Sequence, residues 1–268
     1  MKTLKTALKG IATAAAISLS AAPTNAAVIE LALIIDGSGS IGPTAYNQQL
    51  EAYKNIFADD FFTNIVTTGD ELHVSAWKFS TNVTQAIGWT QLSNDADAAS
   101  FGDLFDTSNT PAFTYTAGTT NTSTETYNAT LSILNNGIDS DKAIIDISTD
   151  GEPFRCQPQC FGNLENTTGY KLASIEAATF AANNDVQVNA IGVGSALNSP
   201  SGQSFLEDYT TAGGGFYVLA SNFGVDFENA LRTKLFREIN DVEVSEPGTL
   251  ALFAIGLAGL AATRRKKA

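Results

Sequence analysis

VIELALII (residues 28–35) is followed directly by DGSGSIG (residues 36–42). A nearly continuous apolar run of this length is typical of a strand that is buried on both faces, as strands in parallel sheets are. The residues after Pro43 have the spacing of an amphipathic helix, because one apolar face is formed by Tyr46, Leu50, Tyr53 and Phe57. The pattern therefore predicts a buried strand, a glycine-rich turn and a helix.

The alternation of strands and helices continues along the chain. Further strands are predicted at 71–80, 82–87, 142–147, 186–193 and 216–220, and further helices at 95–105, 122–134, 163–183, 204–211 and 225–239. Little more than a turn separates the first two of these strands, which predicts an antiparallel hairpin. We expect an α/β fold with a doubly wound, mostly parallel six-stranded sheet, flanked by helices and carrying one antiparallel edge strand.

Composition and charge exclude several classes of protein. The chain has 268 residues, of which 44% are hydrophobic and two are Cys, so neither a disordered chain nor a disulfide scaffold is expected. Its formal net charge is −13, but seven of its 15 cations lie in residues 1–9 and 264–267. The interval 27–247 holds the other eight cations and all 28 acids, a net charge of −20. Nucleic acid is therefore excluded as a partner, because binding phosphates needs a basic surface.

The N-terminal end has the three parts of a secretory signal peptide. Three lysines among the first nine residues precede a small, apolar stretch at 10–22, and small residues lead to Ala26. We place the cleavage after Ala26, with Thr24 at position −3. A retained membrane anchor is the alternative, but about 13 apolar residues are too few to span a bilayer core comfortably.

The C-terminal end carries an apolar run from Thr249 to Thr263, followed by Arg-Arg-Lys-Lys and preceded by Ser245-Glu246-Pro247-Gly248. This order resembles the PEP-CTERM sorting signal of Gram-negative bacteria, with Ser245 in place of the motif's first proline and only Glu246 and Pro247 matching. The resemblance implies export to the cell surface or extracellular matrix, transient membrane insertion of the last helix, and cleavage by an exosortase-type partner. A plain tail anchor is the alternative.

These signals divide the chain into three parts. Residues 1–26 are the expected signal peptide, 27–240 the folded domain, and 241–268 a linker with the sorting segment. The folded domain is therefore the part in which a function must be sought.

The turn at 36–42 admits two interpretations. Gly37, Gly39 and Gly42 match the dinucleotide-binding fingerprint, which lies between a strand and a helix as here. Asp36 would, however, place a carboxylate beside the pyrophosphate. The next strand ends in Phe79-Ser80, where an acid for the ribose hydroxyls is expected. We therefore disfavour a nucleotide site.

The second interpretation is a site for a hard divalent cation. Asp36, Ser38 and Ser40 offer one carboxylate and two hydroxyls at alternate positions, and such oxygen ligands suit Mg²⁺. Two further oxygen-rich loops lie at 118–122, before a helix, and at 149–151, after a buried strand. Loops at the carboxyl ends of parallel strands meet in one crevice, so the three loops can build one site.

The three loops and the order of elements over residues 28–240 are similar to the von Willebrand factor A (vWA) domain and its metal-ion-dependent adhesion site (MIDAS). The resemblance implies five metal ligands: Asp36, Ser38, Ser40, Thr120 and Asp150. Thr119 and Thr122 stay open as alternatives to Thr120. The implied cofactor is Mg²⁺, with Mn²⁺ or Ca²⁺ possible. A coordination position open to solvent would accept a carboxylate from a partner protein or an acidic polysaccharide.

The expected function is a non-enzymatic adhesion module. A structural protein associated with the surface or the exopolysaccharide, in which the metal only stabilises loops, is the alternative. A hydrolase is disfavoured because the chain has no Gly-x-Ser-x-Gly motif and because His73, the single histidine, is expected to pack on the sheet.

Cys156 and Cys160 follow Asp150 closely. In an exported protein such a pair predicts a disulfide that closes a small loop at the rim of the crevice. A redox-active pair is disfavoured because the spacing is not that of a Cys-x-x-Cys site.

Overall fold

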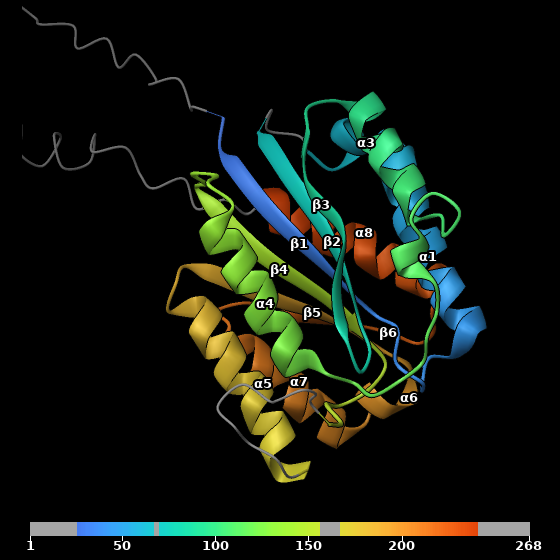
Figure 1. The fold of residues 1–268 in the computed structure, drawn as a ribbon, viewed down its shortest axis with the longest axis vertical. Helices are drawn as coiled ribbons and strands as arrows, with labels where there is room; N and C mark the ends of the chain where they lie inside the picture. Colours follow the sequence, from blue (N-terminus) through green and yellow to red (C-terminus); the bar gives the residue numbers. More distant parts are fainter. Residues whose placement is uncertain (1–25, 67–69, 156–166, 241–268) are drawn as a thin grey trace, which may run out of the picture. The chain divides into compact units, whose positions relative to one another are not determined.

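The computed structural model describes residues 26–66, 70–155 and 167–240. In this part of the chain, six strands form one sheet in the order β3-β2-β1-β4-β5-β6 (Figure 1). The strands are β1 (Val28–Asp36), β2 (Glu71–Phe79), β3 (Val83–Leu92), β4 (Lys142–Thr149), β5 (Val186–Val193) and β6 (Tyr217–Ala220). Only the β2–β3 pair is antiparallel, and β3 lies at the edge. The expected fold class is therefore confirmed.

Helices cover both faces of the sheet (Figure 1). On one face lie α1 (Gly42–Ala58), α2 (Phe61–Asn64), α3 (Asp95–Gly102) and α8 (Val225–Asn240). On the other face lie α4 (Thr122–Asn135), α5 (Thr167–Ala182) and α7 (Pro200–Ala212), while α6 (Gly194–Leu197) is a single turn after β5. The two layers of helices give the sheet a separate hydrophobic core on each side.

The side chains of strand β1 are buried on both faces of the sheet. Alternate side chains of a strand point to opposite faces. Leu31, Leu33 and Ile35 belong to the core beneath α1, and Ala32 and Ile34 belong to the core beneath α4. The continuous apolar run therefore serves two cores at once, as its sequence predicts.

Within the described residues, the observed bounds differ from the expected ones by three residues or more at three places. Strand β3 continues to Leu92, beyond the expected end at 87. Its pairing with β2 contains register shifts, which interrupt the regular alternation of side chains between the two faces of the sheet. Helix α7 begins at Pro200 because the Ser199 side chain accepts a hydrogen bond from the Gly202 amide and caps the helix. The expected helix at 95–105 ends at 102 and continues as a 3₁₀ turn.

One buried charge cluster, which we call the α8 triad, joins α8 to the sheet. Lys234 Nζ of α8 lies 2.5 Å from Asp146 Oδ1 of β4 and also forms an ion pair with Glu238. The three side chains are fully or almost fully buried. The triad fixes α8 against β4, the strand whose end leads to Asp150.

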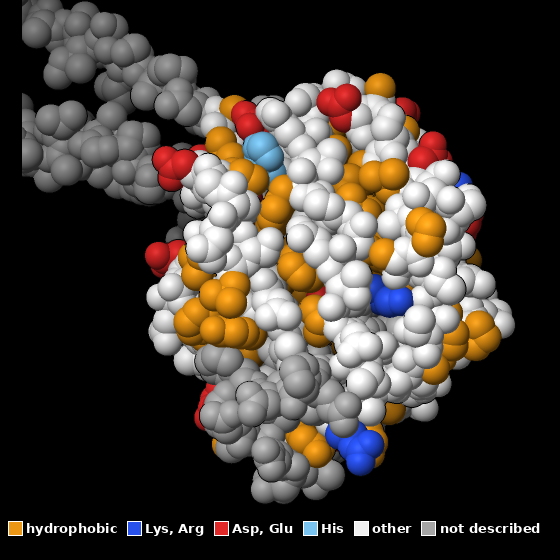
Figure 2. Space-filling model, viewed as in Figure 1, with side chains coloured by type: hydrophobic (Ala, Val, Ile, Leu, Met, Phe, Trp, Pro, Cys, Tyr) orange, Lys and Arg blue, Asp and Glu red, His pale blue; other side chains and the backbone are white. Residues whose placement is uncertain are grey.

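The surface agrees with the acidic composition. On the face shown in Figure 2, more acidic than basic side chains are visible, and hydrophobic side chains lie in small scattered groups. His73 lies on β2, where its ring nitrogen Nε2 is 2.7 Å from Glu71 Oε1. Within the described ranges, no helix has the length and apolar character needed to cross a membrane. The expected signal peptide, sorting helix and Cys156–Cys160 disulfide fall outside the described residues.

Candidate metal site

The five expected ligands come from three loops at the carboxyl edge of the sheet. Asp36 is the last residue of β1, and Ser38 and Ser40 lie in the turn before α1. Thr120 lies just before α4, and Asp150 follows the last residue of β4. Because β1 and β4 are parallel neighbours, their ends bring these loops together.

Hydrogen bonds join the three loops directly. Ser40 Oγ donates to Asp150 Oδ1 at 2.7 Å, and Ser38 Oγ lies 3.1 Å from Ser40 Oγ. The amide of Gly39 donates to the carbonyl of Gly118 at 2.9 Å, two residues before Thr120. The fold therefore brings the loops at 36–42, 118–122 and 149–151 into one cluster, although they lie far apart in the sequence.

The hydrogen bonds also distinguish among the three candidate threonines. Thr122 Oγ1 lies 2.6 Å from Ser174 Oγ of α5, inside the protein. The Thr119 hydroxyl and amide both bond to Thr81 Oγ1, at 3.5 and 3.1 Å. Thr120 is held through its backbone, since its carbonyl accepts a hydrogen bond from the Phe154 amide at 2.9 Å. Thr122 is therefore engaged inside the protein, and Thr120 stays the expected ligand.

Asp36 is held in a fully buried position. Its carboxylate accepts hydrogen bonds from the Ser38 amide at 2.7 Å and from Thr149 Oγ1 at 2.6 Å. Burial nevertheless raises the pKa of Asp36 to about 7, and the nearby charge of Asp150 adds to this rise. Burial also raises the pKa of Asp150. Both carboxylates therefore lack the positive charge that would stabilise their ionised forms.

The loop before Thr120 needs a glycine at position 118. Gly118 has φ +137°, and a Cβ there would lie 2.6 Å from Thr81 Oγ1 and 2.8 Å from the Thr81 amide nitrogen. Ala117 also has a positive φ, +54°. The loop thus adopts a strained conformation that allows Gly118 to reach the Gly39 amide.

Buried polar atoms without partners surround Asp36. Neither carboxylate oxygen of Glu125, nor the hydroxyl of Tyr46, has a hydrogen-bond partner among the described residues. Burial raises the pKa of both side chains, and the charge of Asp36 raises both further. Native proteins rarely leave buried polar atoms unpaired, so this region fits a bound ion and its water.

The donor set indicates which kind of ion would fit. In the part of the chain that the structure describes, no three His, Cys, Asp or Glu side chains are grouped so that they could hold a metal. The candidate site instead combines two carboxylates with three hydroxyls. This set of oxygen ligands suits a hard divalent cation and lacks the thiolates and imidazoles of a structural zinc site. The residues therefore fit the ion that the sequence predicts.

The surroundings of the site are partly apolar. Phe154 is 57% exposed, and its amide donates to the carbonyl of Thr120 at 2.9 Å. A cavity of about 330 Å³ is lined by Asp150 together with apolar residues such as Ile41 and Phe223 and polar residues such as Gln48. A partner that reaches the metal site would meet an exposed aromatic ring and this cavity.

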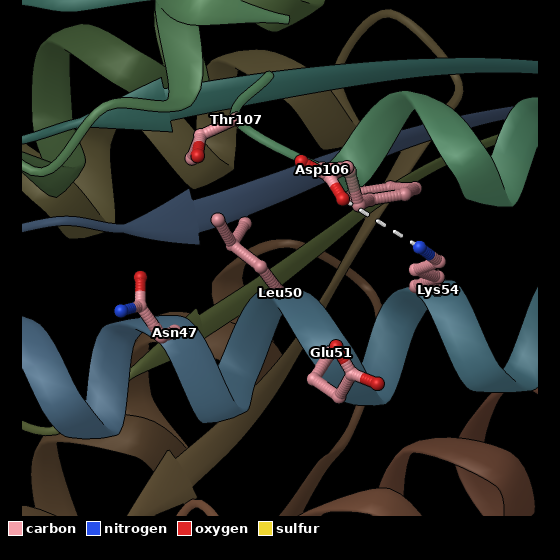
Figure 3. A pocket seen from close by; sticks show the side chains of 7 residues that line it. Asn47, Leu50, Glu51, Lys54, Asp106 and Thr107 are labelled. Atoms are coloured by element: carbon pink, nitrogen blue, oxygen red, sulfur yellow. Dashed lines mark ion pairs between the residues drawn. The ribbon is translucent and has the colours of Figure 1, made fainter. Parts of the chain in front are cut away.

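A second cavity, of about 190 Å³, shares no residue with the metal site. It lies between α1 and the 3₁₀ turn that follows α3, and Figure 3 shows Lys54 directed at Asp106 across it. The Lys54 ammonium is 3.7 Å from Asp106 and from Asp103. Because its cation is already paired with two carboxylates, we assign this cavity no ligand.

Comparison with known families gives two matches. Residues 26–243 match a family described as "Protein of unknown function (DUF1194)". Residues 243–266 match the PEP-CTERM protein-sorting motif, which includes Glu246 and Pro247. No protein of curated function matches the chain.

Solved structures show the same fold. Proximal thread matrix protein 1 from the mussel byssus is 18% identical, with a TM-score of 0.54 over 79% of this chain and 46% of that one. The vWF domain of the pilus tip protein Mfa5 from Porphyromonas gingivalis is 12% identical, with a TM-score of 0.55 over 82% of this chain and 99% of that one. The von Willebrand factor type A protein from Catenulispora acidiphila is 13% identical, with a TM-score of 0.52 over 80% and 43%.

A further structure of the mussel protein is described as having a zinc-occupied MIDAS motif; it is 18% identical, with a TM-score of 0.51 over 80% of this chain and 45% of that one. The present chain thus spans less than half of the mussel protein's length. At these identities, the solved structures show a shared vWA fold.

Proposed function

Because the chain belongs to the DUF1194 family, has the vWA fold and carries a PEP-CTERM sorting signal, we propose that it is an exported adhesion module that binds a protein through a divalent cation. The proposed ligands of the cation are Asp36, Ser38, Ser40, Thr120 and Asp150. The sorting signal marks the chain as a protein that is sorted to the cell surface of a Gram-negative bacterium, with an exosortase-type enzyme as its processing partner.

The observation that supports the proposal is the meeting of three loops that carry two carboxylates and three hydroxyls. Ser40 bonds to Asp150 across the gap between two loops, and Asp36 is fully buried beside them. Three of the five proposed ligands are neutral, so a bound divalent cation keeps an attraction for a further carboxylate. We propose Mg²⁺, because it binds through a few carboxylates and keeps other positions for water or a ligand.

The apolar rim favours a protein over an acidic polysaccharide as the partner. Exposed aromatic rings and apolar cavities are typical of the centres of protein interfaces. Phe154 lies next to Thr120 on one side of the site, and the cavity lined by Ile41 and Phe223 adjoins Asp150 on the other. The proposed partner therefore offers a carboxylate with an apolar side chain near it.

The proposal includes no chemical reaction. His73 lies in the first half of β2, whereas the site lies at the carboxyl end of the sheet, so the single histidine is not available to it. A purely structural role of the metal is less well supported. The bonds from Gly39 to Gly118 and from Ser40 to Asp150 already join the loops without an ion.

Calorimetric titration of the purified chain with Mg²⁺, Mn²⁺ and Ca²⁺ tests the metal site. We expect binding that is lost in Asp36→Ala. The matched control is Asp103→Ala, which removes an exposed carboxylate that pairs only with Lys54 at the surface. Equal cation binding by Asp36→Ala and the wild type would contradict the site.

The partner class is tested by fluorescence anisotropy with a labelled peptide that contains one aspartate beside a leucine. The comparison probes are the same peptide with asparagine and an oligogalacturonate. We expect the aspartyl peptide alone to bind, only with Mg²⁺ and not to Asp36→Ala. Binding that persists in EDTA, binding of the oligogalacturonate alone, or no binding of any probe to the metal-loaded chain would overturn the proposed adhesion function.

A further inference from the structure

Glu125 is a fully buried carboxylate for which the described residues offer no partner. It lies in the first turn of α4, and both of its oxygens lack hydrogen bonds. Burying a carboxylate without a hydrogen bond or a counter-charge is strongly unfavourable. An arrangement of this kind points to a group other than the described residues as the partner of Glu125.

The fold places Glu125 on the same side of the sheet as Asp36. Side chains of β1 alternate between the faces, so Asp36 points to the face of Ala32 and Ile34. Helix α4 packs on that face through Ala129, which is one helical turn after Glu125. The charge of Asp36, after burial, is the second cause of the raised pKa of Glu125. Glu125 therefore lies on the same side of the sheet as Asp36 and close enough for the charge of Asp36 to affect it.

The hydroxyl groups on the neighbouring positions of α4 are engaged elsewhere. Thr122 bonds to Ser174 of α5, and Thr126 Oγ1 lies 2.6 Å from the hydroxyl of Tyr209 on α7. These bonds turn both threonines toward the outer helices. Neither threonine hydroxyl is thus available to Glu125, whose two carboxylate oxygens have no hydrogen-bond partner among the described residues.

We propose that Glu125 is a positioning residue of the metal site, where it accepts a hydrogen bond from a water bound to the cation and adds a third negative charge near it. The inference rests on the proposed metal site. Direct coordination is not proposed, because the described residues contain no three acidic side chains grouped closely enough to hold an ion. A carboxylate one water removed from a metal commonly changes metal affinity by about 10- to 100-fold.

Isothermal titration of the purified chain with Mn²⁺ tests the inference. We expect Glu125→Gln to raise the Kd for Mn²⁺ about 10- to 100-fold, since the shape is kept and the charge is lost. We also expect Glu125→Gln to melt in EDTA no lower than the wild type, because the Glu125 side chain makes no hydrogen bond that the substitution could remove. A purely structural glutamate would instead lower the melting temperature on substitution and leave the affinity for Mn²⁺ unchanged.

The matched control is Glu30→Gln. Glu30 is also buried, but it lies near the start of β1 and its carboxylate is satisfied by Asn136 and by Ser140, at 2.6 Å. We expect the Glu30 variant to bind Mn²⁺ like the wild type and to melt at a lower temperature. If Glu125→Gln does not fold, Glu125→Asp, which keeps the charge, is compared with Glu125→Ser by the same titration, and the aspartate variant is expected to bind more tightly.

The outcomes separate this inference from the proposed function. If the wild type binds no divalent cation, the proposed function fails and the role of Glu125 fails with it. If the wild type binds Mn²⁺ and Glu125→Gln binds it with a Kd within about twofold, only the role of Glu125 is overturned.

Discussion

Replacement of Lys234 by methionine should strongly destabilise the domain. Lys234 is the only cation of the buried α8 triad, where its ammonium lies 2.5 Å from Asp146 and also pairs with Glu238. Methionine keeps most of the apolar stem but leaves two carboxylates buried without a counter-charge. Breaking a buried ion pair on one side commonly reduces the free energy of unfolding by about 3–5 kcal/mol. We expect a loss of that size above pH 8.

The loss should be smaller in acid, because Glu238 can take up a proton. Burial, followed by the charge of Asp146, raises the pKa of Glu238 to about 8 in the folded protein, against an ordinary value of 4.5. The folded state therefore holds this proton more tightly than the unfolded state. The stability contributed by the protonated form is complete below about pH 4.5 and is lost as the pH rises toward 8. Without Lys234 the pKa rises further, so the pH dependence becomes steeper.

Urea unfolding followed by circular dichroism, at pH 6 and pH 9 in EDTA, measures both effects. The matched control is Lys54→Met, which removes a partly exposed ammonium 3.7 Å from Asp103 and Asp106, and which should change the free energy of unfolding by less than about 1 kcal/mol. The double variant Lys234→Met/Asp146→Asn should recover part of the loss. A loss for Lys234→Met below about 1 kcal/mol, or an equal loss at both pH values, would refute the reasoning.

Three further predictions concern the metal site. In EDTA at pH 8, Asp36→Asn should raise the melting temperature, and the variant should no longer be stabilised by Mg²⁺ in thermal scans. Because the pKa of Asp36 is raised to about 7, the stability of the metal-free wild type should fall as the pH rises from about 4 to 7. Thr120→Val should weaken Mn²⁺ binding in calorimetry, whereas Thr122→Val should leave it unchanged. Thr122→Val should instead lower the free energy of unfolding by about 1 kcal/mol, because the hydrogen bond to Ser174 is lost. Gly118→Ala should destabilise the fold by about 1–3 kcal/mol in urea unfolding and weaken Mn²⁺ binding. If this variant unfolds and binds Mn²⁺ like the wild type, the loop tolerates a Cβ at position 118.

The sequence by itself determined the features that depend on neighbouring residues. The continuous apolar run at 28–35 predicted a strand buried on both faces, and the short gap near residue 81 predicted the antiparallel edge hairpin. The alternation of strands and helices predicted the parallel sheet. Asp36, Ser38 and Ser40 were identified because they lie within five residues of one another, in a turn whose place after a strand was clear.

Only the tertiary structure decided the features that depend on residues far apart in the chain. The hydrogen bond of Thr122 inside the protein follows from the position of Ser174 on α5, which the sequence of the threonine tract does not reveal. Glu125 resembles an ordinary first-turn acid of a helix until β1 and α4 bury it on the side of Asp36. Lys234 likewise resembles a surface lysine until β4 brings Asp146 to it. Local patterns set strands, helices and turns, whereas the free energy of a buried charge is set by the partners that the fold brings to it.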